Sequence, residues 1–274
     1  MFSRKREKSV FRYNTLELLI LIGLLGLICG FLSGMLGIGG GIVMAPLLLY
    51  VPPLVGLSPL PMRVVAGLTI VQGLVACLSG ALTHKKFHFV SGPLIGWMGI
   101  TIFITAMAGG AGAGYVSNTV LLTVFALLAF LAAALIFVPT GNDSENPAIE
   151  NFSFSRLRAV MTAGSVGLLG GLVGQGGSFI LIPLMTSFLQ VPTRIAIGSN
   201  LAIVFLSSLA AFLGKALTGQ ILWTLALPLF LTVIPAAHVG GRVSRRVPVA
   251  RLRMILAFFI AVAAIRVGLS AAGY

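Results

Sequence analysis

The fold is decided by a glycine-rich run that occurs twice in the chain. Gly34-Met35-Leu36-Gly37-Ile38-Gly39-Gly40-Gly41 is followed by Pro46-Leu47, and Gly171-Leu172-Val173-Gly174-Gln175-Gly176-Gly177-Ser178 is followed by Pro183-Leu184. Six of the fourteen aligned positions, 34–47 against 171–184, are identical, and each run interrupts an apolar stretch that would otherwise form one membrane helix. Backbone freed by such a break cannot face lipid, because unpaired N–H and C=O groups are costly there. Two breaks at matching positions of two halves predict a transporter with its binding site at the breaks.

The composition is that of a membrane protein. Hydrophobic residues make up 58% of the chain and charged residues only 8%, against roughly 25% charged residues in an ordinary soluble domain. Because a helix needs about 20 residues to cross the hydrocarbon, the apolar stretches predict about eight spans and two half-length segments. The spans are 16–36, 64–82, 92–114, 119–138, 157–174, 195–214, 221–239 and 252–272, and the half-length segments are 42–51 and 178–190. The predicted class is all-α and polytopic, since the alternating pattern of barrel strands is absent.

The net charge of +13 does not indicate a nucleic-acid partner, because the basic residues flank the predicted spans and form no basic domain. One basic cluster precedes the first span and another precedes the last, which is typical of loops on the cytoplasmic side. The first cluster is Arg4, Lys5, Arg6, Lys8 and Arg12, and the second is Arg242, Arg245, Arg246, Arg251 and Arg253. Cys29 and Cys77 stand alone, without the spacing of a metal site or a disulfide framework. No cofactor and no metal are expected.

The chain divides into two homologous halves. We predict a basic cytoplasmic segment at 1–15, a first membrane repeat at 16–138, a polar linker at 139–155 and a second repeat at 156–274. The glycine runs are related by an offset of 137 residues, and the segments from Arg63 and from Arg194 onward are related by an offset of 131. The uncharged loop 112–119 and its arginine-rich counterpart 241–250 favour inverted repeats. Two equal halves give an even number of crossings, however, whereas the arginines before the last span place the C-terminus opposite the N-terminus.

The acidic residues indicate the charge of the substrate. The chain has five of them, Glu7, Glu17, Asp143, Glu145 and Glu150, and none lies deep in a predicted span. Transporters of cations or protons keep a carboxylate within the membrane. An anion held by backbone amides is therefore the favoured substrate, and Glu17 is interpreted as an interfacial carboxylate.

The glycine runs suit an anion site, because glycine permits left-handed backbone and lets successive N–H groups converge. The helices that follow present their N-terminal amides to the same point. We expect the two runs to meet near the bilayer midplane and to bind the substrate through Gly37, Gly39, Gly40, Gly41, Gly174, Gln175, Gly176, Gly177 and Ser178. The alternative is that these glycines only permit close helix packing.

Polar side chains near the runs complete the candidate site. These are Ser199, Asn200, Thr69 and Gln72, each of which could instead make a helix–helix hydrogen bond. Arg63 and Arg194 occupy equivalent positions and are candidate gate residues, with snorkelling flanks as the alternative. No nucleophile elbow, metal-ligand cluster or ATP-binding motif is present, so an enzyme is not expected.

The paired runs GMLGIGGGIVMAPLL and GLVGQGGSFILIPLM, with RVVAGLT and RIAIGSN after them, resemble the TauE/SafE sulfite-exporter family. The resemblance covers nearly the whole chain. It implies a multi-pass protein of the bacterial plasma membrane that moves sulfite or other small sulfur-containing or organic anions. The functional residues it implies are Gly37, Gly39, Gly40, Gly174, Gly176 and Gly177, with Ser199 and Asn200. Leu68-Thr69 departs from the small polar pair that such proteins often show.

The chain is therefore interpreted as a secondary transporter of small anions, with sulfite or an organosulfonate as the first choice and export as the favoured direction. The expected partners are the anionic substrate and the lipid bilayer, and a homodimer is left open. The alternative is a channel or a non-transporting assembly factor for another membrane complex. A flux assay over a panel of anions would separate these functions.

Overall fold

The computed structural model describes residues 15–36, 41–83, 91–136, 154–174 and 177–244, together with Met254, Phe258, Val262 and Ile265. Every regular element in these segments is a helix. The α-helices are α2 (Thr15–Leu36), α3 (Gly41–Leu54), α4 (Met62–Thr83), α5 (Gly92–Gly112), α6 (Asn118–Ile136), α7 (Arg156–Val173), α8 (Ser178–Ser187), α9 (Thr193–Leu217) and α10 (Trp223–Ser244), and a 3₁₀ turn covers Ala113–Tyr115.

These helices agree with the apolar stretches of the sequence, including the two half-length segments, which become α3 and α8. The last predicted span, 252–272, lies almost wholly outside the described residues. By length and composition, four helical segments can cross a membrane: Leu16–Met35, Gly92–Tyr115, Asn118–Leu135 and Trp223–Val243. Shorter apolar segments cover Gly41–Leu54, Met62–Leu78 and Ala202–Leu217. The protein is therefore an all-helical, multi-pass membrane protein.

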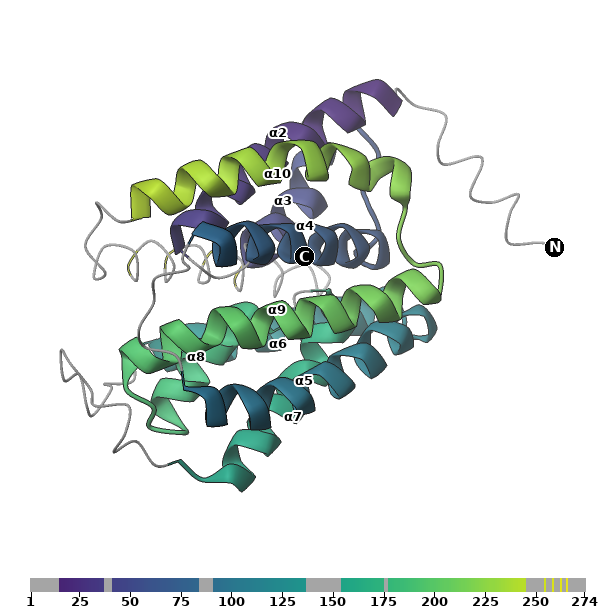
Figure 1. Cartoon of the computed structure of the whole chain (residues 1–274). Coiled ribbons are helices and arrows are strands. Elements are labelled where there is room, and N and C mark those ends of the chain that lie inside the picture. Colours follow the sequence, from purple (N-terminus) through teal and green to yellow (C-terminus); the bar gives the residue numbers. More distant parts are fainter. Residues whose placement is uncertain are drawn as a thin grey trace.

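The helices form two groups that exchange members between the halves of the chain. In Figure 1, α2, α3, α4 and α10 form the upper group, and α5, α6, α7, α8 and α9 form the lower group. The main contacts of α10 are with α2 and α4, while α5 packs on α7 and α9. Helix α10 of the second half thus belongs to the group of the first half, and α5 and α6 belong to the group of the second.

The two largest helix interfaces repeat each other residue by residue. At three glycines on each interface, an added Cβ would meet backbone atoms of the partner helix, so the backbones approach closely as small residues allow. Between α2 and α10, the glycine contacts are Gly30 with Val233, Gly34 with Ala237 and Gly240 with Phe31. Between α5 and α7, the equivalent contacts, in the same order, are Gly167 with Ile102, Gly171 with Ala106 and Gly109 with Leu168. The matching pairs are related by the same offsets, 137 and 131, that relate the two halves of the sequence. The halves therefore build the same packing.

The contacts also give the directions of the helices. Helices α2 and α10 are parallel, because Gly23 faces Pro228 and Gly34 faces Ala237. Helices α4 and α9 are antiparallel, as three contacts along their length show. Near the start of α4, Gly67 faces the backbone of Gln220 just after α9; in the middle, the side chains of Cys77 and Ser208 hydrogen-bond; and Ser91, after α4, contacts Ser199 near the start of α9.

The parallel arrangement of α2 and α10 corrects one expectation from the sequence. The basic clusters before the first and last spans were both expected on the cytoplasmic side. The start of α2 and the end of α10 lie at opposite ends of this helix pair (Figure 1), and Arg242 is in the last turn of α10. The chain therefore leaves α10, with Arg242, on the side opposite to the one where it enters α2.

Candidate functional site

The second glycine run breaks the chain between α7 and α8 as the sequence predicts. Gly174 ends α7 in the left-handed conformation, with a φ of 76°, and its N–H bonds to the carbonyls of Gly170 and Gly171. Gly177 precedes α8 with a φ of 72° and supplies no side-chain cap. Residues other than glycine rarely adopt such backbone angles, so this change of direction depends on glycine at both positions.

Helix α4 of the first half contacts this break. The Thr69 hydroxyl donates to the carbonyl oxygen of Gly174 at 3.0 Å, and it also lies 3.3 Å from the carbonyl of Ala66 in its own helix. A Cβ on Gly174 would collide with the Ala66 carbonyl. The candidate residue Thr69 is therefore at the second break, although it belongs to the first half.

Several candidate residues lie outside the described part of the chain. These are Gly37, Gly39, Gly40, Gln175 and Gly176, together with the side chains of Ser178 and Arg194. Gly41, at the start of α3, is buried.

Two buried amide side chains have no hydrogen-bond partner among the residues that the structure describes. Gln72 of α4 and Asn200 of α9 are both 0% exposed, and all four of their amide atoms are unpaired. Leaving a buried polar group unsatisfied costs about 1–3 kcal/mol, and buried polar groups in native proteins are almost always paired. Such groups suit the binding of a polar ligand.

The repeat relates Asn200 to the first break. Asn200 is the equivalent of Thr69, 131 residues later, and Gly37 is the equivalent of Gly174, 137 residues earlier. Asn200 is therefore the sequence counterpart of the side chain that contacts Gly174 at the second break.

The other candidate side chains make structural contacts. The Ser199 hydroxyl accepts a hydrogen bond at 3.1 Å from the backbone N–H of Ser91, the residue that precedes α5. Arg63 is exposed, and its guanidinium donates to the Val116 carbonyl at 2.9 Å, while its backbone N–H donates to the Asn118 side chain at 3.2 Å. Arg63 is thus anchored to the connection between α5 and α6.

The sequence analysis missed Lys215. This residue lies in the last turn of α9 and is 0% exposed, and its ammonium donates to the carbonyl of Leu172 at 3.1 Å. Leu172 is near the end of α7, two residues before Gly174. The available signal was a single lysine inside the apolar run AAFLGKALTG, because charged residues within a span are rare and are usually functional.

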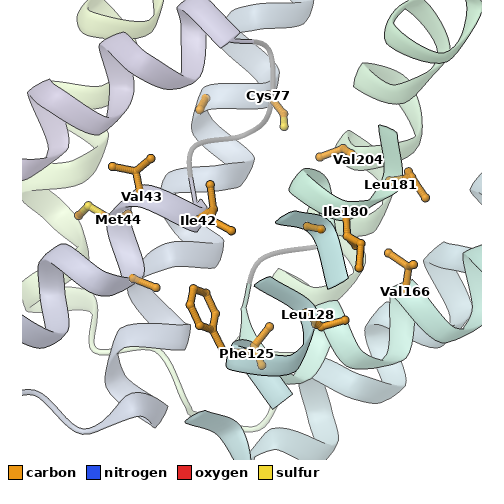
Figure 2. Close-up of a cluster of buried hydrophobic side chains, with 14 of the residues drawn as sticks. Ile42, Val43, Met44, Cys77, Phe125, Leu128, Val166, Ile180, Leu181 and Val204 are labelled. Atoms are coloured by element: carbon orange, nitrogen blue, oxygen red, sulfur yellow. The ribbon is translucent and has the colours of Figure 1, made fainter. Parts of the chain in front are cut away.

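The two glycine runs do not start side by side, contrary to the expectation that they meet at the midplane. Helix α2 ends near the end of α10, whereas α7 ends near the ends of α5 and α9, at the opposite end of the bundle. Gly39 and Gly176 themselves lie outside the described residues. Helices α3 and α8 contact each other. Figure 2 shows Ile42 of α3 and Ile180 of α8 in one buried cluster with Phe125 and Leu128 of α6.

The candidate polar groups accordingly lie at two levels. Asn200 and Lys215 are fifteen residues apart on α9, which corresponds to about 22 Å along the helix axis. Thr69, Gly174 and Lys215 form one level, at the second break. Among the residues that the structure describes, no three His, Cys, Asp or Glu side chains are grouped as metal ligands would be.

Comparison with protein families identifies the family of this chain. The family model described as sulfite exporter TauE/SafE matches residues 22–267. The chain belongs to this family. TauE/SafE proteins are membrane transporters and not enzymes, so the protein is a membrane transporter of the TauE/SafE family.

Similar curated proteins cover most of the chain. The probable membrane transporter protein YunE of Bacillus subtilis is 27% identical over 81% of this chain and 86% of its own length. A probable membrane transporter protein of Haemophilus influenzae is 24% identical over 90% of this chain and 97% of its own. Another, from Xylella fastidiosa strain Temecula1, is 28% identical over 92% and 94%. No solved structure matches the chain.

Proposed function

We propose that this TauE/SafE protein is a secondary transporter of small anions in the bacterial plasma membrane, with sulfite or an organosulfonate as substrate. The observation that carries the proposal is the combination of a glycine break with unpaired amides in the interior. Gln72 and Asn200 offer neutral donors in a buried environment. The carboxylate in the described segments, Glu17, is exposed in the first turn of α2. Bound anions need donors and positive charge, and in the described segments the buried amides supply donors with no buried carboxylate to oppose them.

The repeat arrangement proposed for this transporter is inverted, with about eight spans and two half-length helices. The equivalent helices α4 and α9 run antiparallel and contact each other through the equivalent residues Cys77 and Ser208. A two-fold axis through this contact, perpendicular to the helices, relates the halves. Inverted repeats with discontinuous helices are typical of carriers that expose one site to the two sides in turn.

Export is the favoured direction. Sulfite carries one to two negative charges near neutral pH. A membrane potential of 100 mV, negative inside, is worth about 2.3 kcal/mol per charge. Outward movement of an anion therefore needs no further coupling, whereas uptake needs an ion gradient.

The test is flux by the purified protein in liposomes. Vesicles loaded with sulfite, methanesulfonate, sulfate, acetate or chloride would be assayed for protein-dependent efflux, with potassium as the cation control. Saturable efflux that is accelerated by substrate on the opposite side is the result expected of a carrier. Non-saturating flux without this acceleration would identify a channel. No flux of any anion from correctly folded protein would contradict the proposal and favour an assembly factor.

A further inference from the structure

Two arginines in the first turn of α7 stack on aromatic rings of neighbouring elements. The guanidinium of Arg156 lies over the Trp97 ring of α5, 5.4 Å from the ring centre. The guanidinium of Arg158 lies over the ring of Phe188, the residue after α8, at 5.9 Å. Stacking uses the face of a guanidinium and leaves the N–H donors on its edge. All four residues are exposed, and together they form an arginine–aromatic surface.

The positive charges of this surface are unfavourable for α7 itself. The first turn of a helix carries a partial positive charge, and the first turn of α7 has no acidic residue. The carboxylate in the described segments, Glu17, lies in the first turn of α2. Gly23 of α2 faces Pro228 near the start of α10, and α10 follows the end of α9, where Lys215 contacts the end of α7. Glu17 is therefore at the other end of the bundle, and no described carboxylate compensates the two arginines.

Trp97 indicates that this surface lies at a membrane–water interface, where tryptophan is enriched. The chain has two tryptophans, and they lie at opposite ends of the bundle. Trp97 is near the start of α5, and Trp223 begins α10. Gln220, just before α10, donates from its side chain to the carbonyl of Gly110 near the end of α5. From Trp97 toward that end, exposed apolar side chains continue along α5 and α7: Ile100, Ile104, Met161 and Leu168. The arginines therefore lie at the level of the lipid headgroups, beside a surface that suits acyl chains.

We propose that the arginine–aromatic surface binds anionic phospholipids, with their phosphates on the guanidinium edges and their acyl chains along the exposed apolar residues of α5 and α7. Arginine binds a phosphate through two parallel N–H···O bonds. Basic residues next to the membrane are attracted to an anionic leaflet. A zwitterionic lipid also has a phosphate, but the cationic group of its own headgroup offsets the charge. The surface therefore selects lipids with a net negative charge.

The two tryptophans allow a direct test with an internal control. Trp223→Phe leaves Trp97 as the fluorescent residue, and Trp97→Phe leaves Trp223. Each full-length protein would be reconstituted in phosphatidylcholine vesicles that contain a minor fraction of phosphatidylglycerol or phosphatidylcholine brominated on the acyl chains, because bromine quenches tryptophan on contact. The ratio of quenching by the two brominated lipids measures the preference for negative charge and corrects for changes in exposure.

The charges are then removed in the Trp223→Phe protein by Arg156→Gln and Arg158→Gln, separately and together. Arg242→Gln is the matched control, because it removes an exposed arginine from α10, which belongs to the other helix group (Figure 1). Folding of each variant would be checked by its melting temperature. Titration with sodium chloride is the second measurement, since salt screens the attraction between exposed charges.

The expected preference of Trp97 for phosphatidylglycerol is at least about fivefold, the contribution of one basic residue near an anionic leaflet, whereas Trp223 should show no preference. The preference should fall in each single arginine variant, disappear in the double variant and persist in Arg242→Gln. Equal quenching of Trp97 by the two lipids would overturn the proposal, as would an unchanged preference in the folded double variant. If the double variant does not fold, a preference that does not decrease with salt would overturn it. Loss of the preference on adding inorganic phosphate at constant ionic strength would reject the lipid in favour of a soluble anion.

Discussion

The left-handed glycine at the end of α7 provides a sharp test of whether the break geometry is needed. Gly174 has a φ of 76°, and a Cβ at this position would collide with the Ala66 carbonyl of α4. Gly174→Ala therefore introduces two separate costs, backbone strain and a steric clash with the opposite half. The clash also pushes on the Ala66 carbonyl, which is one of the two carbonyls that accept from the Thr69 hydroxyl.

Two control glycines separate the cost of backbone strain from the cost of the steric clash. An L-residue in the left-handed region costs roughly 1–2 kcal/mol, and forcing extra volume into a packed site costs typically about 1–3 kcal/mol. Gly174→Ala should therefore destabilise by about 2–5 kcal/mol. Gly219 has a φ of 68° with nothing within 4 Å of an added Cβ, so Gly219→Ala should cost the strain alone. Gly96 lies within α5 with open space around it, and Gly96→Ala should stabilise by about 0.5–1 kcal/mol.

The assay is thermal unfolding of the three purified variants in detergent, followed by flux in liposomes. The expected order of melting temperature is Gly96→Ala, wild type, Gly219→Ala and Gly174→Ala, from highest to lowest. Flux should be lost only in Gly174→Ala. If Gly174→Ala melted together with Gly219→Ala and transported normally, the close approach of α4 to the break would have no role in stability or in transport.

Three further predictions follow from the buried amides and the repeated packing. Gln72→Leu removes an unpaired buried amide, so its melting temperature should equal or exceed that of the wild type while flux falls at least about tenfold; normal flux would exclude Gln72 from the substrate path. Asn200→Asp should reduce flux more than Asn200→Ala, because it sets a negative charge against an anion in a medium of low dielectric constant; the opposite order in vesicle assays would indicate a cationic substrate. Gly109→Ala and Gly240→Ala should lower the melting temperature by similar amounts, since each Cβ meets the equivalent backbone of a partner helix, and a neutral effect of either one would argue against equivalent interfaces.

The positions of the helices could be predicted from the sequence because the apolar runs and the glycine breaks are local signals. The two offsets of the sequence repeat also recur in the structure. Gly34 contacts Ala237 and Gly171 contacts Ala106, and these equivalent pairs are related by the offsets 137 and 131. The exchange of α5 and α10 between the groups could not be predicted in this way. Similarity between the halves tells which helices are equivalent, but it does not tell which helices pack together.

The location of the first break follows from the length of the first helix. Helix α2 has 22 residues, or about 33 Å, and therefore crosses the whole hydrocarbon layer before the glycine run begins. Gly34 in the last turn of α2 faces Ala237 near the end of α10, whereas Leu172 near the end of α7 contacts Lys215 in the last turn of α9, so the two runs begin at opposite ends of the bundle. Lys215 was not predicted for a different reason, because it lies one residue beyond the predicted span 195–214.

The contacts of α4 and α9 predict that the two halves of the protein move together. Thr69 of α4 bonds to Gly174 of the other half, and the repeat relates Asn200 of α9 to the first break in the same manner. Since α4 and α9 also contact each other through Cys77 and Ser208, we predict that a sliding of α4 against α9 would act on both Thr69 and its counterpart Asn200. Thr69→Val keeps the shape of the side chain but removes the hydroxyl, so it should slow transport in both directions and not only from the face nearest Gly174. We would measure efflux and uptake by oriented vesicles containing this variant. A defect confined to one direction would show that the two breaks open independently, and the coupling through α4 and α9 would have to be abandoned.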